Sequence, residues 1–194
     1  METSNRRVML TNVRLAFPVL NEPEAFEAGG KPRYSATALF EPNSENHKLC
    51  IAAVRAAAAE KWGEAKADAA VKGLTAGLKV ALQNGDLKSD YAGFEGMMFV
   101  GANAQANTPP TLLDGQRKQL PRDTSMIYAG CYVNMSVEFW AQDNQYGKRI
   151  NASVRGVQFV KDGDAFGAGA PASTDEFGVV EGAPVETAAD EDFA

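Results

Sequence analysis

The segment 131–160 constrains the fold most strongly, because it carries the clearest alternation of apolar and polar residues in the chain. In its first part, 131–140 (CYVNMSVEFW), every second residue is apolar, which is typical of a strand with one buried face. The turn residues DNQYG follow at 143–147, and 148–160 (KRINASVRGVQFV) runs back as a second strand. The segment therefore predicts a long antiparallel hairpin.

A glycine interrupts the second strand of this hairpin. Up to Val154 the apolar residues keep one parity, but Val157 and Phe159 fall in the polar parity. Gly156 lies at the break, and an extra residue there would turn the following apolar side chains back toward the core. We therefore predict a β-bulge at Gly156.

Three other segments are predicted as strands. Residues 33–40 (RYSATALF) alternate cleanly between apolar and polar. Residues 97–100 (MMFV) are apolar throughout, which is typical of a strand buried on both faces. Residues 6–17 form the first strand, in which the apolar residues of one parity are expected in the core: Met9, Val13, Leu15 and Phe17.

One substantial helix is predicted over 45–70, which is rich in Ala, Glu and Lys. Ser44 offers an N-cap, and Gly73 and Gly77 are expected to end the helix. The stretch 104–128 has no sustained period, so it is either a functional loop or contains a short element. Together these segments predict a mainly β domain with one substantial helix (α+β), in which the sheet is a barrel or strongly curved.

The charges divide the chain into two parts. All 19 Lys and Arg lie at or before Lys161, with 16 of the 25 Asp and Glu, so residues 1–161 carry a net charge of +3. Residues 162–194 hold the other nine acids and no base. They are rich in Gly, Ala and Pro, and such a segment buries too little apolar surface to offset its ordering entropy. We predict a folded domain over 1–161 and a disordered acidic tail over 162–194.

Several classes of protein and site are not indicated. Cys50 and Cys131 are too few for a disulfide framework, so a reducing cytoplasm is expected. With His47, the single histidine, they fall one ligand short of a structural zinc site. No apolar run approaches the roughly 18 residues that span a bilayer, and no secretory signal pattern opens the chain. Neither a membrane span nor a cofactor is expected.

Signatures of catalysis are weak. One histidine makes a His-activated nucleophile improbable, and no phosphate-binding loop of the GxxxxGK[ST] type is present in the sequence. Asp114, Asp123 and Asp143 could hold Mg²⁺ as in nucleases, but scattered loop aspartates are more typical of turns. The sequence thus favours a protein that is not an enzyme and has no metal site.

The outer face of the predicted hairpin combines aromatic rings with guanidinium groups. Tyr132 and Trp140 fall in the polar parity, near Arg149 and Arg155. Bases of unpaired nucleic acid stack on such rings, while cations bind the phosphates. Other cations on a neighbouring strand, the long loop and the turn could extend the surface. The candidate DNA-binding residues are Arg33, Arg117, Lys118, Arg122, Tyr132, Trp140, Lys148, Arg149 and Arg155.

The acidic tail has two interpretations. It is a solubilising segment, as acidic blocks often are. Alternatively, its charges imitate a phosphate backbone and compete for the cationic surface. Once displaced by DNA, its last residues would then bind a basic, aromatic-accepting pocket of another protein. These partner-binding residues are Asp190, Glu191, Asp192 and Phe193.

The sequence resembles the phage single-stranded-DNA-binding proteins with an OB fold, which are distantly similar to the helix-destabilising proteins of T7-like phages. The matching stretches are VRLAFPVLNEPEAF, GKPRYSATALFEP, DYAGFEGMMFVGANA, IYAGCYVNMSVEFWAQDN, RGVQFVKDGDAFG and the acidic tail. The resemblance implies an OB-fold-like barrel and sequence-independent binding of single-stranded DNA. It also implies a role in phage replication or recombination, with phage or host replication proteins as partners, in the cytoplasm of an infected bacterium. One departure is that Ala194 follows Phe193, whereas the tails of the T7-like relatives end on the aromatic residue.

Two alternatives stay open at this point. In one, the rings of Tyr132 and Trp140 dock onto another protein, or onto a second copy of the chain in a homodimer. In the other, the loop aspartates bind Mg²⁺ and the protein is a metal-dependent nuclease. Non-enzymatic binding of single-stranded DNA is the leading hypothesis.

Overall fold

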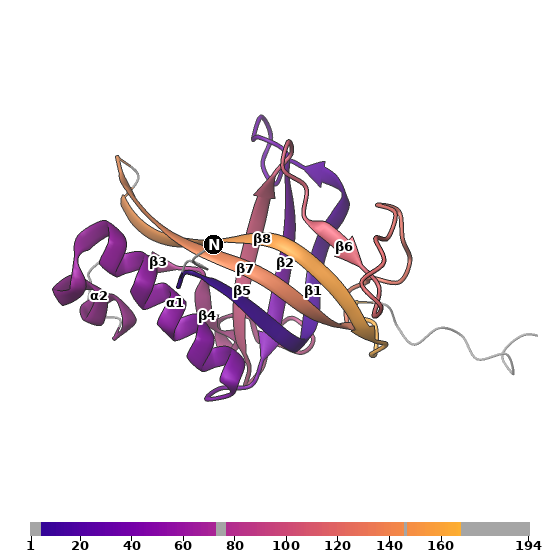
Figure 1. The fold of residues 1–194 in the computed structure, drawn as a ribbon, viewed down its shortest axis with the longest axis horizontal. Helices are drawn as coiled ribbons and strands as arrows, with labels where there is room; N and C mark the ends of the chain where they lie inside the picture. Colours follow the sequence, from indigo (N-terminus) through magenta and orange to yellow (C-terminus); the bar gives the residue numbers. More distant parts are fainter. Residues whose placement is uncertain (1–4, 73–76, 146, 168–194) are drawn as a thin grey trace, which may run out of the picture.

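The long C-terminal hairpin is the largest unit of the fold. The structure, a computed structural model, describes residues 5–72, 77–145 and 147–167. In it β7 (Tyr132–Asn144) and β8 (Gly147–Lys161) pair antiparallel over their whole lengths, as predicted. Figure 1 shows this hairpin crossing obliquely over the strands β1, β2 and β5. The other elements are β1 (Arg7–Glu24), β2 (Arg33–Phe40), α1 (Glu45–Trp62), α2 (Glu64–Val71), β3 (Lys79–Val80), β4 (Leu82–Asn84), the 3₁₀ helix η1 (Gly85–Lys88), β5 (Met98–Gln105) and β6 (Thr111–Leu113).

The strands form one curved sheet. Its order is β3-β8-β7-β1-β2-β5-β4, and β6 pairs with β8. One further pairing, between Asn103 of β5 and Ser153 of β8, joins two strands that lie four places apart in this order. The mainly β class is therefore confirmed. The short β6 lies inside 104–128, which bears out the expectation of a short element there.

The bulge predicted at Gly156 is confirmed. Ser136 pairs with Gly156 and Val137 pairs with Val154, so Arg155 is the extra residue on β8. Beyond the bulge Val157 is buried, and Phe159 packs partly buried against the core.

The first strand departs from its predicted phase. Met9 was expected in the core but is 53% exposed, and Leu10 is buried in its place. A register shift between Leu10 and Val13 explains the difference, because Asn12 adopts a positive φ of 50° and changes the parity. Val13 and Leu15 are buried as predicted.

A second shift in β1 turns Phe17 outward. Its φ is 46°, the pairing with β2 shifts between Ala16 and Val19, and its ring is 43% exposed. The prediction of a core position for Phe17 is therefore wrong. A left-handed backbone at a bulky residue is rare and carries no local sequence signature.

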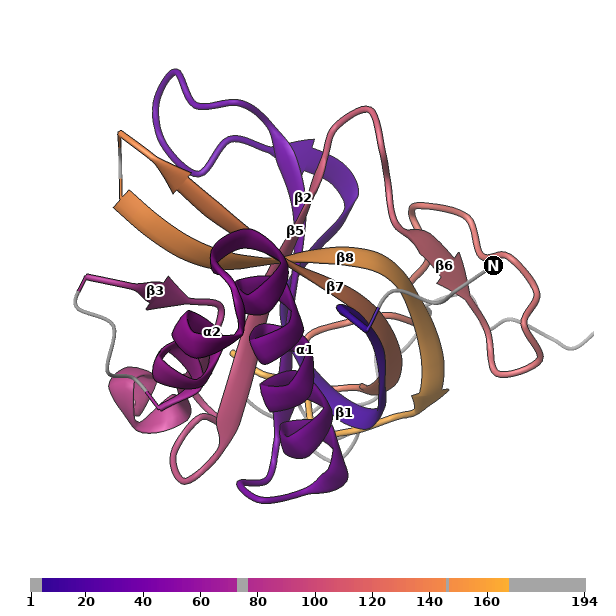
Figure 2. The same ribbon diagram turned by 60° about the vertical axis from the view of Figure 1, so that its left-hand side comes forward.

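The single predicted helix is two helices. α1 ends at Trp62 and α2 begins at Glu64, with the break at Gly63, whose φ is 86°. Ser44 caps α1 as predicted, since its Oγ accepts a hydrogen bond from the His47 backbone N–H at 3.3 Å. Figure 2 shows both helices at one end of the sheet. Among the helices that the structure describes, none is long and apolar enough to cross a membrane.

The core has two parts. The larger lies inside the curved sheet under α1, which buries its alanine-rich face. The smaller lies on the other side of β2 and β5 and consists of Ala16, Leu39, Phe94 and Phe99. Phe99 and Val100 are both buried, in different clusters, so the prediction of a strand buried on both faces is confirmed. The predicted tail lies largely outside the described residues, which end at Gly167, and its disorder stays a prediction.

Both cysteines should resist thiol reagents in the folded protein. Cys50 and Cys131 are unpaired and fully buried. Burial raises the pKa of Cys50 to about 12, and it also raises the pKa of Cys131. Because the thiolate is the reactive form, we expect no labelling by iodoacetamide at pH 8 and two labels per chain in urea. Labelling of either residue in the native protein, detected by mass spectrometry, would contradict this packing.

Candidate nucleic-acid interface

A shallow groove lies on the outer face of β1, β2 and β5, opposite the main core. It encloses about 510 Å³. Its floor consists of small residues because the register sets Thr37 beside Gly101 and Ser35 beside Asn103. A Cβ added at Gly101 would meet only the Thr37 hydroxyl, 4.0 Å away, so the floor is open at that point. We call this site the β2–β5 groove; its lining is Phe17, Pro18, Val19, Phe26, Arg33, Ser35, Thr37, Lys88, Tyr91, Gly101, Ala102 and Asn103.

Three exposed rings line the groove. Phe17 is 43% exposed, while Phe26 and Tyr91 are each 52% exposed. Phe17 meets Tyr91 edge to face, with ring centroids 5.1 Å apart. Phe94 is buried beneath this pair and lies 5.6 Å from Phe17. The rings of Phe17 and Tyr91 are therefore exposed to solvent but supported from below, an arrangement suited to stacking.

Two cations flank the rings. The Arg33 guanidinium lies 4.8 Å from the Phe26 ring centre, and the Lys88 ammonium lies 5.7 Å from that of Phe17. Both cations are exposed, and within the described ranges neither forms an ion pair with a carboxylate. Their positive charges are thus available to an anion in the groove.

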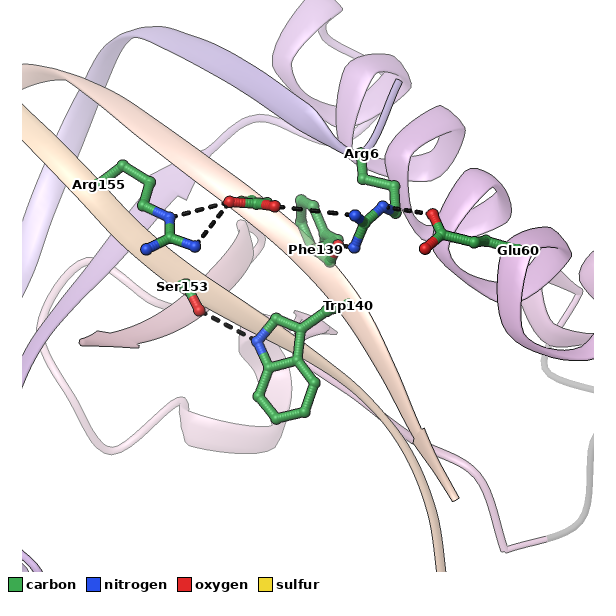
Figure 3. A network of polar contacts seen from close by, with 7 residues as sticks. Arg6, Glu60, Phe139, Trp140, Ser153 and Arg155 are labelled. Atoms are coloured by element: carbon green, nitrogen blue, oxygen red, sulfur yellow. Dashed lines mark hydrogen bonds and ion pairs between the residues drawn. The ribbon is translucent and has the colours of Figure 1, made fainter. Parts of the chain in front are cut away.

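The same outer surface continues onto the hairpin. Asn103, in the groove, pairs with Ser153 of β8. The Trp140 indole lies across β8 and donates to the Ser153 hydroxyl at 3.0 Å, as Figure 3 shows. Trp140 is 38% exposed. The predicted Trp140 and Arg33 therefore belong to one outer surface of the sheet, joined through small polar residues.

The two rings predicted on the hairpin are far apart. Tyr132 and Trp140 are eight residues apart on one strand, which is about 26 Å at ~3.3 Å per residue. Tyr132 is half-buried, with the Lys161 ammonium 4.6 Å from its ring centre and the Arg14 guanidinium at 5.9 Å. The two rings therefore cannot stack on neighbouring bases.

The carboxylate of Glu138 lies between cations on the outer face of the hairpin. Glu138 lies 2.8 Å from Arg155 and 3.9 Å from Arg6, and Arg6 also contacts Glu60 at 2.6 Å (Figure 3). The predicted Arg155 is thus paired with a carboxylate, whereas no carboxylate in the described part of the chain pairs with Arg33 in the groove.

The remaining predicted cations lie away from the groove lining. Arg122 donates to the carbonyls of Leu20 and Pro110, at 3.3 and 2.6 Å, and so fastens the long loop to β1. Arg117 and Lys118 are exposed at a turn of that loop. On β8, Lys148 lies 3.8 Å from a carboxylate oxygen of Asp143, and the nearby Arg149 is half-buried.

Among the rings and cations of the groove, four were not in the predicted set of DNA-binding residues: Phe17, Phe26, Lys88 and Tyr91. Phe17 was assigned to the core by its parity. Phe26 and Tyr91 lie in irregular segments and Lys88 ends the short 3₁₀ helix η1, where no periodicity marks a surface. The only local signal is the density of aromatic and glycine residues in YAGFEG at 91–96.

The aspartates considered as metal ligands do not form a cluster in the described structure. Asp114 accepts backbone hydrogen bonds within its own turn, and Asp143 accepts from the Trp62 indole at 3.1 Å. Across 5–72, 77–145 and 147–167, no group of three His, Cys, Asp or Glu side chains is arranged to hold a metal ion.

Comparisons with known proteins agree with these features. Residues 6–194 match the family model described as Enterobacter phage Enc34, ssDNA-binding protein. The putative protein p50 of Acyrthosiphon pisum secondary endosymbiont phage 1 is 36% identical over 174 residues, which cover 88% of this chain and 92% of that relative.

Two structures extend the comparison. The single-stranded DNA-binding protein from bacteriophage Enc34, in complex with ssDNA, is similar with a TM-score of 0.70 and 28% identity; the match covers 86% of this chain and 96% of that one. The gp2.5 single-stranded DNA-binding protein of bacteriophage T7 shares the fold at 10% identity, with a TM-score of 0.56 over 93% of this chain and 100% of that one. The chain therefore belongs to the family of the Enterobacter phage Enc34 ssDNA-binding protein, a class of proteins that are not enzymes.

Proposed function

We propose that this protein binds single-stranded DNA without sequence preference during phage replication or recombination, through the β2–β5 groove and the adjoining Trp140. The family match and the structure of the Enc34 relative in complex with ssDNA support this function. The observation that carries it is the grouping of three exposed rings with two cations over a floor of small residues; among the residues that the structure describes, neither cation forms an ion pair.

The chemistry of the groove fits unpaired nucleotides better than duplex DNA. Flat rings can stack on any base, and each such contact contributes about 1–3 kcal/mol. Arg33 and Lys88 then bind the phosphates on either side of the stacked bases. Since Ser35, Thr37 and Gly101 have short side chains, the sugar-phosphate chain can lie close to the sheet.

An OB-fold-like barrel remains part of the proposal. Support comes from the spatial order of the strands: β8 pairs with β7, β7 with β1, β1 with β2, and β2 with β5. The contact between Asn103 of β5 and Ser153 of β8 then joins the last strand back to the first. Five strands joined in this circular way, with a helix at one end, are the arrangement expected of an OB fold. The homodimer considered above stays a prediction.

Removing one ring of the groove should weaken binding to DNA. We expect Tyr91→Ala to reduce affinity for oligo(dT) roughly 5- to 150-fold, the equivalent of one lost stacking contact. The matched control is Leu87→Ala, because Leu87 is 75% exposed on the same loop but outside the groove lining. Fluorescence anisotropy at fixed salt measures both variants. Equal affinities for the two variants would contradict the proposed site.

The cations of the groove should appear in the salt dependence. Each phosphate contact adds about 0.7 to the slope of log K against log salt concentration for a single strand. Lys88→Ala and Arg33→Ala should each lower that slope by about 0.7. Lys66→Ala, an exposed lysine on α2, should leave it unchanged. The proposal fails if all three variants keep the slope of the unchanged protein.

We also propose that the acidic tail competes with DNA and recruits replication proteins. The basis is the division of charge, with nine acids and no base beyond Lys161. Replacing Asp190, Glu191 and Asp192 by the corresponding amides should raise affinity for oligo(dT) at low salt, and the gain should shrink as salt rises. Phe193→Ala, which keeps every charge, is the control and should not alter DNA affinity. An unchanged affinity in the amide variant would contradict the proposal that the tail competes with DNA.

The nuclease and protein-docking alternatives make different predictions. Incubating a labelled oligonucleotide with the protein and Mg²⁺ should leave its length unchanged. Trp140→Ala should weaken oligonucleotide binding while the protein stays folded; if Trp140 serves only protein docking, the affinity for DNA is unaffected.

A further inference from the structure

The root of the acidic tail, residues 162–167, is fastened to the folded domain. The Tyr128 hydroxyl donates to the Asp162 carboxylate at 2.9 Å and accepts from the Gly163 N–H at 3.1 Å. A Cβ at Gly163 would lie 2.3 Å from the Gly130 carbonyl oxygen, so only glycine fits where the two segments cross. This segment therefore packs against the start of β7.

Arg14 of β1 holds the same segment from below. Its Nη2 donates to the Asp164 carbonyl at 2.8 Å, and its Nε donates to the Gly130 carbonyl at 3.2 Å. The Phe166 N–H donates to the Ala129 carbonyl at 2.9 Å. One guanidinium thus ties β1, the start of β7 and the tail root together.

The side chain of Phe166 fills a place in the smaller core. It packs against the cluster that contains Phe94 and Phe99. The Arg14 guanidinium lies 4.3 Å from its ring centre. A Cβ at Gly93 would lie 2.5 Å from the ring, so the ring rests directly on the Gly93 backbone.

The loop under Phe166 also carries part of the β2–β5 groove. This loop, 85–97, holds Lys88 and Tyr91 in the groove lining. Within it, Phe94 lies 6.1 Å from Tyr91 between ring centres, and the Lys88 ammonium lies 6.0 Å from the Phe94 ring centre. Phe166 therefore supports from behind the same loop that presents a ring and a cation to the groove.

From these contacts we infer that Phe166 is a positioning residue for DNA binding, acting through the 85–97 loop. The inference rests on the proposed function of the groove. Without the Phe166 ring, Gly93 loses the side chain that rests on it and the cluster of Phe94 and Phe99 loses a neighbour, so Tyr91 and Lys88 are held less firmly. Binding must then order the loop, and affinity falls although no DNA contact has been removed. Functionally, residues 162–167 belong to the binding domain and the tail begins after Gly167.

A double-mutant cycle in the full-length protein tests this role. Phe166→Ala should reduce affinity for oligo(dT) about threefold to tenfold, the cost of ordering one or two released side chains. In a Tyr91→Ala, Lys88→Ala background the same substitution should have little further effect. Trp140 lies outside the loop, so in a Trp140→Ala background Phe166→Ala should reduce the affinity by the same factor as in the unmodified protein.

Three controls separate positioning from general loss of stability. Phe166→Leu, which still fills the cluster, should restore most of the affinity. Phe166→Val, a smaller side chain that fills the cluster only in part, carries the same cycle if Phe166→Ala does not fold. Val157→Ala, a cavity in the main core, should lower the urea midpoint without changing affinity. Circular dichroism at the temperature of the binding assay establishes that each variant is folded.

Three results would contradict a positioning role for Phe166. This role is overturned if Phe166→Ala, or Phe166→Val in its place, leaves affinity unchanged, or if the loss is equally large in the Tyr91→Ala, Lys88→Ala background. A gain in affinity would overturn it too, because the tail root would then be restraining access to DNA. Failure of the unmodified protein to bind oligo(dT) would instead reject the proposed function itself.

Discussion

β1 pairs with β7 over its first half and with β2 over its second, and these pairings contain three register shifts. At the first two shifts a non-glycine residue has positive φ: Asn12 at 50° and Phe17 at 46°. The second shift turns the Phe17 ring out of the core and onto Tyr91. Without that turn the outer face of β2 and β5 would have no aromatic wall beside its small-residue floor. Strained backbone at a bulky residue often accompanies a functional site, and here it builds one side of the groove.

The hairpin and the β2–β5 groove, the two halves of the outer sheet surface, differ in how their cations are paired. On the hairpin, Glu138 pairs with Arg155, so the charge of that arginine is offset by a carboxylate. In the β2–β5 groove, Arg33 and Lys88 lie against rings, and within 5–72, 77–145 and 147–167 no carboxylate pairs with either. A domain with a net charge of only +3 can therefore present local positive charge where rings are also exposed.

Much of the fold was predictable because its signals are local. The alternation in 131–160 and the glycine in β8 sufficed to predict the hairpin and its bulge, and Ser44 marked the start of α1. The β1 shifts were not predictable, since nothing in the sequence around Asn12 or Phe17 demands positive φ. Of the candidate site, Arg33 and Trp140 were anticipated. Lys88 and Tyr91 were not, because their position depends on Phe94 and Phe166, which are remote from β2 in sequence.

Ultraviolet crosslinking of the full-length protein to oligo(dT), followed by mass spectrometry of the linked peptides, tests the location of the interface most directly. Ultraviolet light joins a base directly to a side chain that is in contact with it, without a linker. The account predicts crosslinked peptides that contain Phe17, Phe26 or Tyr91, with a weaker product at Trp140. Crosslinks confined to Tyr132 and the 114–122 loop, with none in the groove, would contradict it.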